Sequence, residues 1–149
     1  MTKVDAGSEE QFFMDIEAAA KQAIWCALAT VRNNEPRVRM VHPTWEGKVL
    51  WIATGPETAK AKEIRENGAV DIQFQVAPED FVHLMVRGRA EVLSDQPTKD
   101  RIWDVMDYDL SQFFPDGPGS DDYCLIRVEP SRVELSEMFG TQNKRVWHL

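Results

Sequence analysis

Hydrophobic residues recur along this chain at two spacings, one typical of strands and one typical of helices. Alternating or nearly continuous apolar runs predict strands at 23–31, 37–45, 49–54, 70–76, 81–93 and 123–135. Apolar residues three and four positions apart predict helices at 8–21, 57–67 and 97–106. The first helix is expected to begin at Ser8, because the acidic residues after it form a pattern similar to a capping box.

Short turns join the first three predicted strands. The stretches 33–36 and 46–48 have the Asn, Pro and Gly content of tight turns. Strands joined so closely must be antiparallel, since a parallel crossover needs a dozen or more residues, and a meander is the simplest arrangement. The long strand at 81–93 can bend around a closed sheet, with Gly88 at a bulge or corner. We therefore expect a mainly β fold, a six-stranded antiparallel β-barrel with peripheral helices.

A single domain over residues 1–149 is expected, because no repeat, low-complexity tract or linker divides the chain. The barrel would occupy about 23–138, followed by a short C-terminal tail. The stretch 107–122, rich in Asp, Pro and Gly, is the one long irregular segment, and it could be a lid, an oligomer contact or a solvated loop. It lacks the glycine and glutamate of an EF-hand loop, which excludes that calcium site.

Charge limits the ligands and partners of this protein. There are 17 basic and 25 acidic residues, and the net charge of -8 argues against nonspecific binding to nucleic acid or anionic membranes. An anionic ligand must therefore be held by a local cluster of positive charge. The first residues do not resemble a signal peptide and no apolar stretch could span a bilayer, so we expect a cytoplasmic protein. Cys26 and Cys124 lie in separate apolar segments, which is typical of buried free thiols.

Familiar catalytic motifs are missing from the sequence. It contains no GxGxxG, Walker phosphate loop, GxSxG, HExxH or zinc-deaminase pattern. His42, His83 and His148 share no metal-ligand spacing, so no metal site is expected.

Two basic segments flank a predicted hairpin. Arg37 and Arg39 lie on one strand, and residues 54–62, TGPETAKAK, run from the next strand into a helix. If these strands pair, a guanidinium comes close to the helix start, where free N–H groups and the helix dipole already favour an anion. Thr58 and the lysines add further donors, which predicts a phosphate pocket. In the alternative interpretation, Thr58 only caps the helix and the lysines only solvate its exposed face.

In this order and spacing, the sequence resembles the pyridoxamine 5'-phosphate oxidase-like flavoproteins, and above all their general stress protein subgroup. The resemblance rests on Arg39-Met40-Val41, on residues 50–54 leading to Thr58-Ala59-Lys60, and on the strand at 82–93. It covers about residues 10–135 and implies a six-stranded split β-barrel that forms a homodimer. FMN would lie in a cleft at the subunit interface.

The resemblance implies six residues around the FMN phosphate: Arg37, Arg39, Thr58, Ala59, Lys60 and Lys62. Arg39, Thr58 and Lys60 match positions that hold the phosphate in the family. Ala59 stands where the oxidases have an arginine, so one contact is missing, and Lys62 or Arg37 could replace it.

Four residues are implied along the flavin ring: Met40, Val41, Thr54 and His83. His83 stands where the oxidases have a glutamine that reaches the flavin. Trp51, Trp103 and Phe113 are candidates to shield the ring, although core packing is the commoner role of such residues.

The flavin in such a protein supplies the redox chemistry, and the chain binds and orients it. We expect an FMN-dependent oxidoreductase that uses NAD(P)H on a small-molecule acceptor. The C-terminal Arg-x-His element of true pyridoxamine 5'-phosphate oxidases is absent, so pyridoxamine phosphate is not the expected substrate. Three alternatives stay open: a flavin-sequestering stress protein with little turnover, FAD in place of FMN, and the same fold with F420 or with haem held by a histidine.

Overall fold

The structure is a computed structural model that describes the backbone of residues 1–149 and every side chain except that of Pro78. Nine strands of this described chain form one sheet: β1 (Thr2–Lys3), β2 (Cys26–Arg32), β3 (Glu35–Val41), β4 (Thr44–Glu46), β5 (Val49–Thr54), β6 (Ala69–Gln75), β7 (His83–Leu93), β8 (Cys124–Glu137) and β9 (Gln142–His148). The helical elements are α1 (Glu9–Ala20), α2 (Ala59–Glu66), α3 (Gln96–Val105) and the 3₁₀ turns η1 (Pro78–Asp80) and η2 (Leu110–Gln112).

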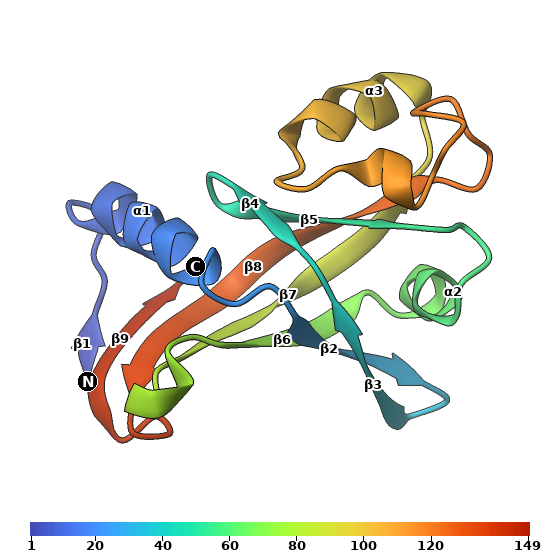
Figure 1. Cartoon of the computed structure of the whole chain (residues 1–149). Helices are drawn as coiled ribbons and strands as arrows, with labels where there is room; N and C mark the ends of the chain where they lie inside the picture. Colours follow the sequence, from blue (N-terminus) through green and yellow to red (C-terminus); the bar gives the residue numbers. More distant parts are fainter.

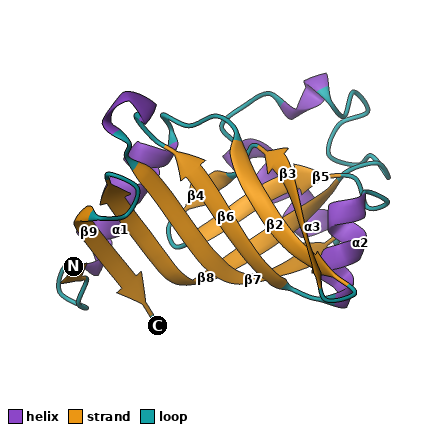
Figure 2. Ribbon diagram, turned by 90° about the horizontal axis from the view of Figure 1, so that it is seen from below, coloured by secondary structure: helices purple, strands orange, loops and turns teal.

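Most strands lie side by side in the order β1-β9-β8-β7-β6-β2-β3, as the curved layer in Figure 2 shows. Neighbours are antiparallel except for β1 and β9, which makes the sheet mixed. The long strand β8 shares one of its edges between two partners: residues 124–128 pair with β5, and residues 132–137 pair with β9. The β4–β5 hairpin therefore leaves the main layer and crosses it (Figure 1).

All six predicted strands are present, as β2, β3, β5, β6, β7 and β8, and the three predicted helices are α1, α2 and α3. The predicted count of six strands is nevertheless wrong, because β1, β4 and β9 join the same sheet. The end of the chain, expected to be a short tail, forms β9. Its Trp147 is buried against the core and donates from Nε1 to Glu9 Oε1 at 2.6 Å, which ties β9 to α1.

The predicted meander is also wrong. The strand expected at 37–45 is interrupted: β3 ends at Val41 and pairs with β2, and residues 44–46 form β4, which pairs with β5. Pro43 stands at the interruption and has no N–H to donate to a ladder. The chain therefore changes direction there, and β5 continues along β8 instead of along β3.

Two local predictions are confirmed and one is not. Asn33 and Asn34 have φ of 51° and 62°, so they form the tight turn that joins β2 and β3. The register of β7 and β8 shifts between Arg87 and Gly88, where a Cβ would collide with the carbonyl oxygen of Glu129. Ser8 precedes α1 but does not cap it, because its hydroxyl donates to the Asp5 carboxylate at 3.0 Å.

The core has two parts. The larger part lies between the sheet and α1, which buries Phe12, Phe13 and Ile16. The smaller part lies beside α3 and is built around Trp51, Ile102, Met106, Leu110, Tyr123 and Leu125. None of the helices in the described chain has the length and apolar character that a membrane crossing requires.

Both cysteines are buried free thiols, as predicted. Burial raises the pKa of the Cys26 thiol to about 12, so the thiol stays protonated. The described residues include no group of three or more His, Cys, Asp or Glu side chains placed to hold a metal ion.

Candidate functional site

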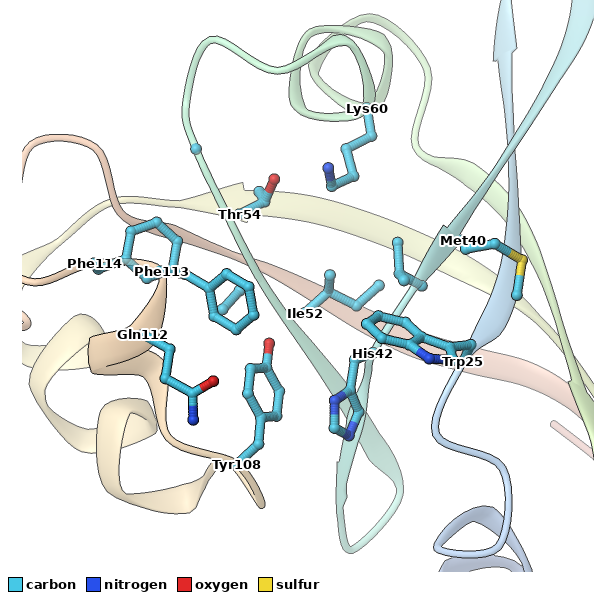
Figure 3. A pocket seen from close by; sticks show the side chains of 13 residues that line it. Trp25, Met40, His42, Ile52, Thr54, Lys60, Tyr108, Gln112, Phe113 and Phe114 are labelled. Atoms are coloured by element: carbon cyan, nitrogen blue, oxygen red, sulfur yellow. The ribbon is translucent and has the colours of Figure 1, made fainter.

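A cavity of about 450 Å³ opens between the end of β3, strand β5, the start of α2 and the segment that follows α3 (Figure 3). Its volume is within the range of small-molecule sites. It is lined by Trp25, Met40, Val41, His42, Ile52, Ala53, Thr54, Gly55, Lys60, Tyr108, Gln112, Phe113 and Phe114. Polar groups lie at one end of this cavity and aromatic rings at the other.

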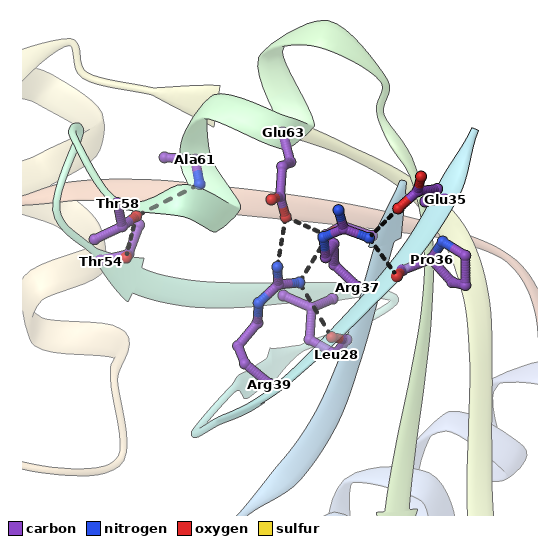
Figure 4. A network of polar contacts seen from close by, with 10 residues as sticks. Leu28, Glu35, Pro36, Arg37, Arg39, Thr54, Thr58, Ala61 and Glu63 are labelled. Carbon is purple, nitrogen blue, oxygen red and sulfur yellow. Dashed lines mark hydrogen bonds and ion pairs between the residues drawn. The ribbon is translucent and has the colours of Figure 1, made fainter. Parts of the chain in front are cut away.

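The polar end is built where β5 passes into α2. Thr58 is the N-cap of α2, and its Oγ1 accepts from the N–H of Ala61 at 3.4 Å and donates to the carbonyl of Gly55 at 2.8 Å. Thr54 Oγ1 lies 3.2 Å from Thr58 Oγ1 (Figure 4). These bonds fix the turn, and the helix start beyond it is favourable for an anion because of its free N–H groups and dipole.

Lys60 supplies the charge at this end. Its half-buried ammonium points into the cavity on the same side as Thr54 (Figure 3). Burial lowers the pKa of Lys60, and the nearby charge of Arg39 lowers it further. Four other lysines of the described chain form ion pairs with carboxylates, whereas Lys60 forms none. A partly desolvated ammonium without a counter-ion is well suited to bind an anion.

Arg39 is paired within the protein (Figure 4). Its Nη2 donates to Glu63 Oε1 at 2.5 Å, and its Nη1 donates to Thr30 Oγ1 at 2.7 Å. The Glu63 side chain is only 4% exposed. Burial opposes its ionised form, but hydrogen bonds from Thr30 and Arg39 outweigh this and hold the pKa of the Glu63 carboxyl below its ordinary value. The pair joins α2 to β3.

Aromatic side chains form the other end of the cavity. Tyr108 stacks on His42 with ring centroids 4.1 Å apart. Trp25 makes an edge contact with His42 at an interplanar angle of 65°, and Phe113 makes one with Tyr108 at 83°. His42 Nε2 lies 3.2 Å from Asp107 Oδ1, which fixes the imidazole. Burial and the charge of Asp107 raise the pKa of Tyr108 to about 12, so its hydroxyl stays protonated. This end suits a planar ring with polar edges.

Four of the residues expected at the site line the cavity: Met40, Val41, Thr54 and Lys60. Thr58 adjoins it through its contact with Thr54. Arg39 is not among the described lining residues, although its charge lies close enough to Lys60 to affect that pKa. Ala59, the first residue of α2, is exposed.

The other three expected residues lie elsewhere. Arg37 pairs with Glu35 at 3.1 Å, and Lys62 pairs with Glu57 at 3.4 Å. His83 lines a second cavity on the outer face of β6, β7 and β8. Of the three candidates for shielding a ring, Phe113 lines the first cavity, whereas Trp51 and Trp103 pack in the smaller core cluster.

Sequence reasoning missed most of the aromatic end. The sequence does not point to Trp25, Tyr108 or Gln112, and it suggests His42 only as a possible metal or haem ligand. These residues come from segments far apart in the sequence and meet only in the fold. A signal was present in the stretch 107–122, where Tyr108, Phe113 and Phe114 stand among mostly polar residues.

Comparison with known proteins gives a clear relationship. The sequence model described as pyridoxamine 5'-phosphate oxidase matches residues 14–137. General stress protein 26 of Bacillus subtilis (strain 168) is 30% identical over 111 residues, which is 73% of this chain and 76% of that protein.

Solved structures share the fold. A Clostridium acetobutylicum protein related to general stress protein 26 matches with a TM-score of 0.77 at 19% identity, over 98% of this chain and 97% of that one. A pyridoxamine 5'-phosphate oxidase-related, FMN binding protein of Nostoc punctiforme PCC 73102 matches with a TM-score of 0.70 at 21% identity, over 91% of this chain and 88% of that one. An F420 reductase matches with a TM-score of 0.60 at 26% identity, over 78% of this chain and 94% of that one. The family match and the identity to general stress protein 26 confirm the predicted relationship, and the chain belongs to the pyridoxamine 5'-phosphate oxidase family.

Proposed function

We propose that this protein binds FMN in the 450 Å³ cavity and acts as a flavin-dependent oxidoreductase. The observation that carries the proposal is the polarity of the cavity, which has an unpaired ammonium at one end and stacked aromatic rings at the other. FMN has the matching polarity, with a phosphate dianion at one end and a planar ring at the other. The Nostoc relative of the same fold is described as an FMN binding protein, which supports this choice.

We assign the phosphate to the end formed by Thr54, Thr58 and Lys60. The ammonium of Lys60 would neutralise part of its charge, and the Thr54 hydroxyl and the first N–H groups of α2, including that of Ala59, would donate hydrogen bonds. The Thr58 hydroxyl already donates to the Gly55 carbonyl, so Thr58 would act by fixing the turn. Met40 and Val41 would border the ring. Arg37 and Lys62 are held by neighbouring carboxylates, so they are weaker candidates for the missing family arginine.

We further propose a homodimer with the cofactor at the subunit interface. Large apolar side chains gather around the cavity mouth and on the adjoining face of β3, each more than half exposed: Ile24, Trp25, Val38, Met40 and Phe113. Covering them with a second copy would bury this surface and close the cavity. His83 lies in a different cavity, so it could contact the flavin only as His83 of the partner subunit.

When bound, FMN would supply electron transfer between NAD(P)H and a small-molecule acceptor. The chain would bind the phosphate, hold the ring and limit water access from the aromatic side. His42, fixed by Asp107 and stacked on Tyr108, is part of the ring end and would lie beside the flavin. Two buried free thiols agree with a reducing compartment, so we expect the protein to act in the cytoplasm.

A deazaflavin is the second candidate ligand, because an F420 reductase shares 26% identity and the fold. Purified protein separates the two: its visible spectrum and the mass of any released chromophore identify the ligand. Titration with FMN, FAD, riboflavin and F420 then ranks their affinities. We expect FMN to bind most tightly, and tighter binding of F420 would overturn the assignment.

Turnover is tested separately. Anaerobic stopped-flow mixing with NADH or NADPH should bleach the bound flavin, and an acceptor should restore its colour over repeated cycles. Flavin that binds tightly but is not reduced would favour a sequestering role with little turnover.

A further inference from the structure

We propose that Glu63 is a specificity-determining residue that weakens the hold of the site on phosphate by competing for the charge of Arg39. The inference rests on the proposed function, because it concerns the end of the cavity assigned to the FMN phosphate. Its basis is the pair of Arg39 on β3 with the buried Glu63, which lies about one helical turn after Lys60 on α2.

Further hydrogen bonds hold the Arg39–Glu63 pair together. Glu63 Oε1 accepts from Thr30 Oγ1 at 2.7 Å as well as from Arg39, and Leu28 O accepts from Arg39 Nη1 at 3.3 Å. Thr30 is as fully buried as the carboxylate, so water cannot replace these bonds without disrupting β2. The carboxylate therefore stays charged and stays beside Arg39.

Arg39 still has donors to spare. A guanidinium has five N–H groups, and the contacts with Leu28, Thr30 and Glu63 use three of them. The other two have no partner among the described residues, and the side chain is 23% exposed. Arg39 could thus donate to a phosphate near Lys60, but its positive charge would already be offset by Glu63.

Charge counting gives the consequence. Arg39 and Lys60 contribute two positive charges at this end and Glu63 one negative charge, so the three side chains together carry +1. Arg32 also acts on Glu63, but it is exposed at the end of β2, where water and salt screen its charge. A phosphate monoester carries nearly two negative charges at neutral pH. Because Glu63 is three residues after Lys60, the two side chains share a face of α2, and the carboxylate acts on the same anion. Removing its charge should match the site to a dianion.

The test compares FMN with riboflavin, which has the same ring but no phosphate, by quenching of flavin fluorescence. Glu63→Gln keeps an oxygen that can accept from Thr30 and Arg39 but removes the charge. We expect FMN affinity to rise about tenfold, which is the effect of one charge-assisted contact, and riboflavin affinity to change less than twofold. Glu66→Gln, an exposed change on the same helix, is the matched control and should leave both affinities within twofold.

An unchanged or reduced preference for FMN in Glu63→Gln would overturn the role of Glu63, provided that the wild-type protein binds FMN. Wild-type protein that binds neither flavin would overturn the proposed function itself, and with it this inference. Thermal unfolding checks that each variant folds. Glu63→Met, which also removes the charge and has good helix propensity, gives the same comparison if Glu63→Gln does not fold.

Discussion

The two ends of the cavity are built in different ways. The phosphate end comes mainly from residues 54–60, where one turn and the first residues of α2 fix each other through local hydrogen bonds. The aromatic end is assembled from Trp25, His42, Tyr108 and Phe113, which belong to three separate segments and meet only by packing. The charged end of the cavity is therefore encoded locally in this protein, whereas the aromatic end depends on the whole fold.

The two ends also differ in exposure. Lys60 is half-buried and the Glu63 carboxylate is only 4% exposed, but Trp25 and Phe113 are about 60% exposed. We infer that the phosphate end fixes the position of a ligand and that the ring end stays open to an acceptor or a second subunit. The comparison of FMN with riboflavin separates the two contributions, and the following predictions use it.

The largest effect is expected for the stability of the phosphate end. Arg39→Ala leaves the buried Glu63 carboxylate without its counter-ion and should lower the free energy of unfolding by about 3 kcal/mol. Urea denaturation measures this change. The double variant Arg39→Ala/Glu63→Gln should recover most of the loss, because no uncompensated charge is left. A single variant as stable as the wild type would show that the pair does not join α2 to β3.

The next effect concerns affinity at the same end. Lys60→Met should weaken FMN binding by about 1.5 to 3 kcal/mol, or tenfold or more, because a partly buried ammonium loses its hydrogen bond to the phosphate. Riboflavin binding should change less than twofold. Lys62→Met is the control, since Lys62 is exposed and pairs with Glu57. Equal losses of FMN affinity in the two variants would place the phosphate elsewhere.

A smaller effect is expected at the ring end. Tyr108→Leu removes the stack on His42 and should weaken FMN and riboflavin binding alike, by about 1 kcal/mol. The preference for FMN over riboflavin should stay unchanged, which distinguishes this variant from Lys60→Met. A loss confined to FMN would mean that Tyr108 lies near the phosphate and that the orientation of the ligand is reversed.

The same contrast explains what the sequence could predict. Strands β2, β3 and β5 to β8 follow from their apolar patterns, and the phosphate end follows from the contiguous residues 54–60. Strand β9 was missed because its first four residues are polar, and its place depends on a long-range bond between Trp147 and Glu9. The meander prediction is wrong because Pro43 divides residues 37–45 into two strands with different partners, and the apolar pattern of this stretch does not show the division.

The Arg39–Glu63 pair could not be foreseen for a similar reason. Glu63 occupies a position on a short helix where a charged residue is ordinarily solvated. Its burial depends on how α2 lies against β2 and β3, where Thr30 and Arg39 reach it. Sequence patterns give the face of a helix but not the side chain that it meets across the fold.

The smallest predicted effect is a pH dependence with opposite signs for stability and affinity. Burial holds the pKa of Lys60 in the folded protein below its ordinary value of 10.5, which applies to the unfolded chain. At pH values between the folded and the unfolded pKa, the unfolded chain therefore binds more protons than the folded one. The contribution of Lys60 to stability must then rise with pH across this window. Its contribution to FMN affinity must fall over the same pH range, because Lys60 loses the proton that makes it a cation. The phosphate, with a second pKa of about 6, stays a dianion there.

The free energy of unfolding and the FMN affinity of wild type and Lys60→Met, measured between pH 7 and 10.5, would give both pH dependences of Lys60 by difference. Riboflavin is the reference ligand. If stability and FMN affinity changed with pH in the same direction, another group would titrate at this end of the cavity. In that case the charge count of +1 for Arg39, Lys60 and Glu63 would have to include a fourth side chain, and the expected gain in Glu63→Gln would change with it.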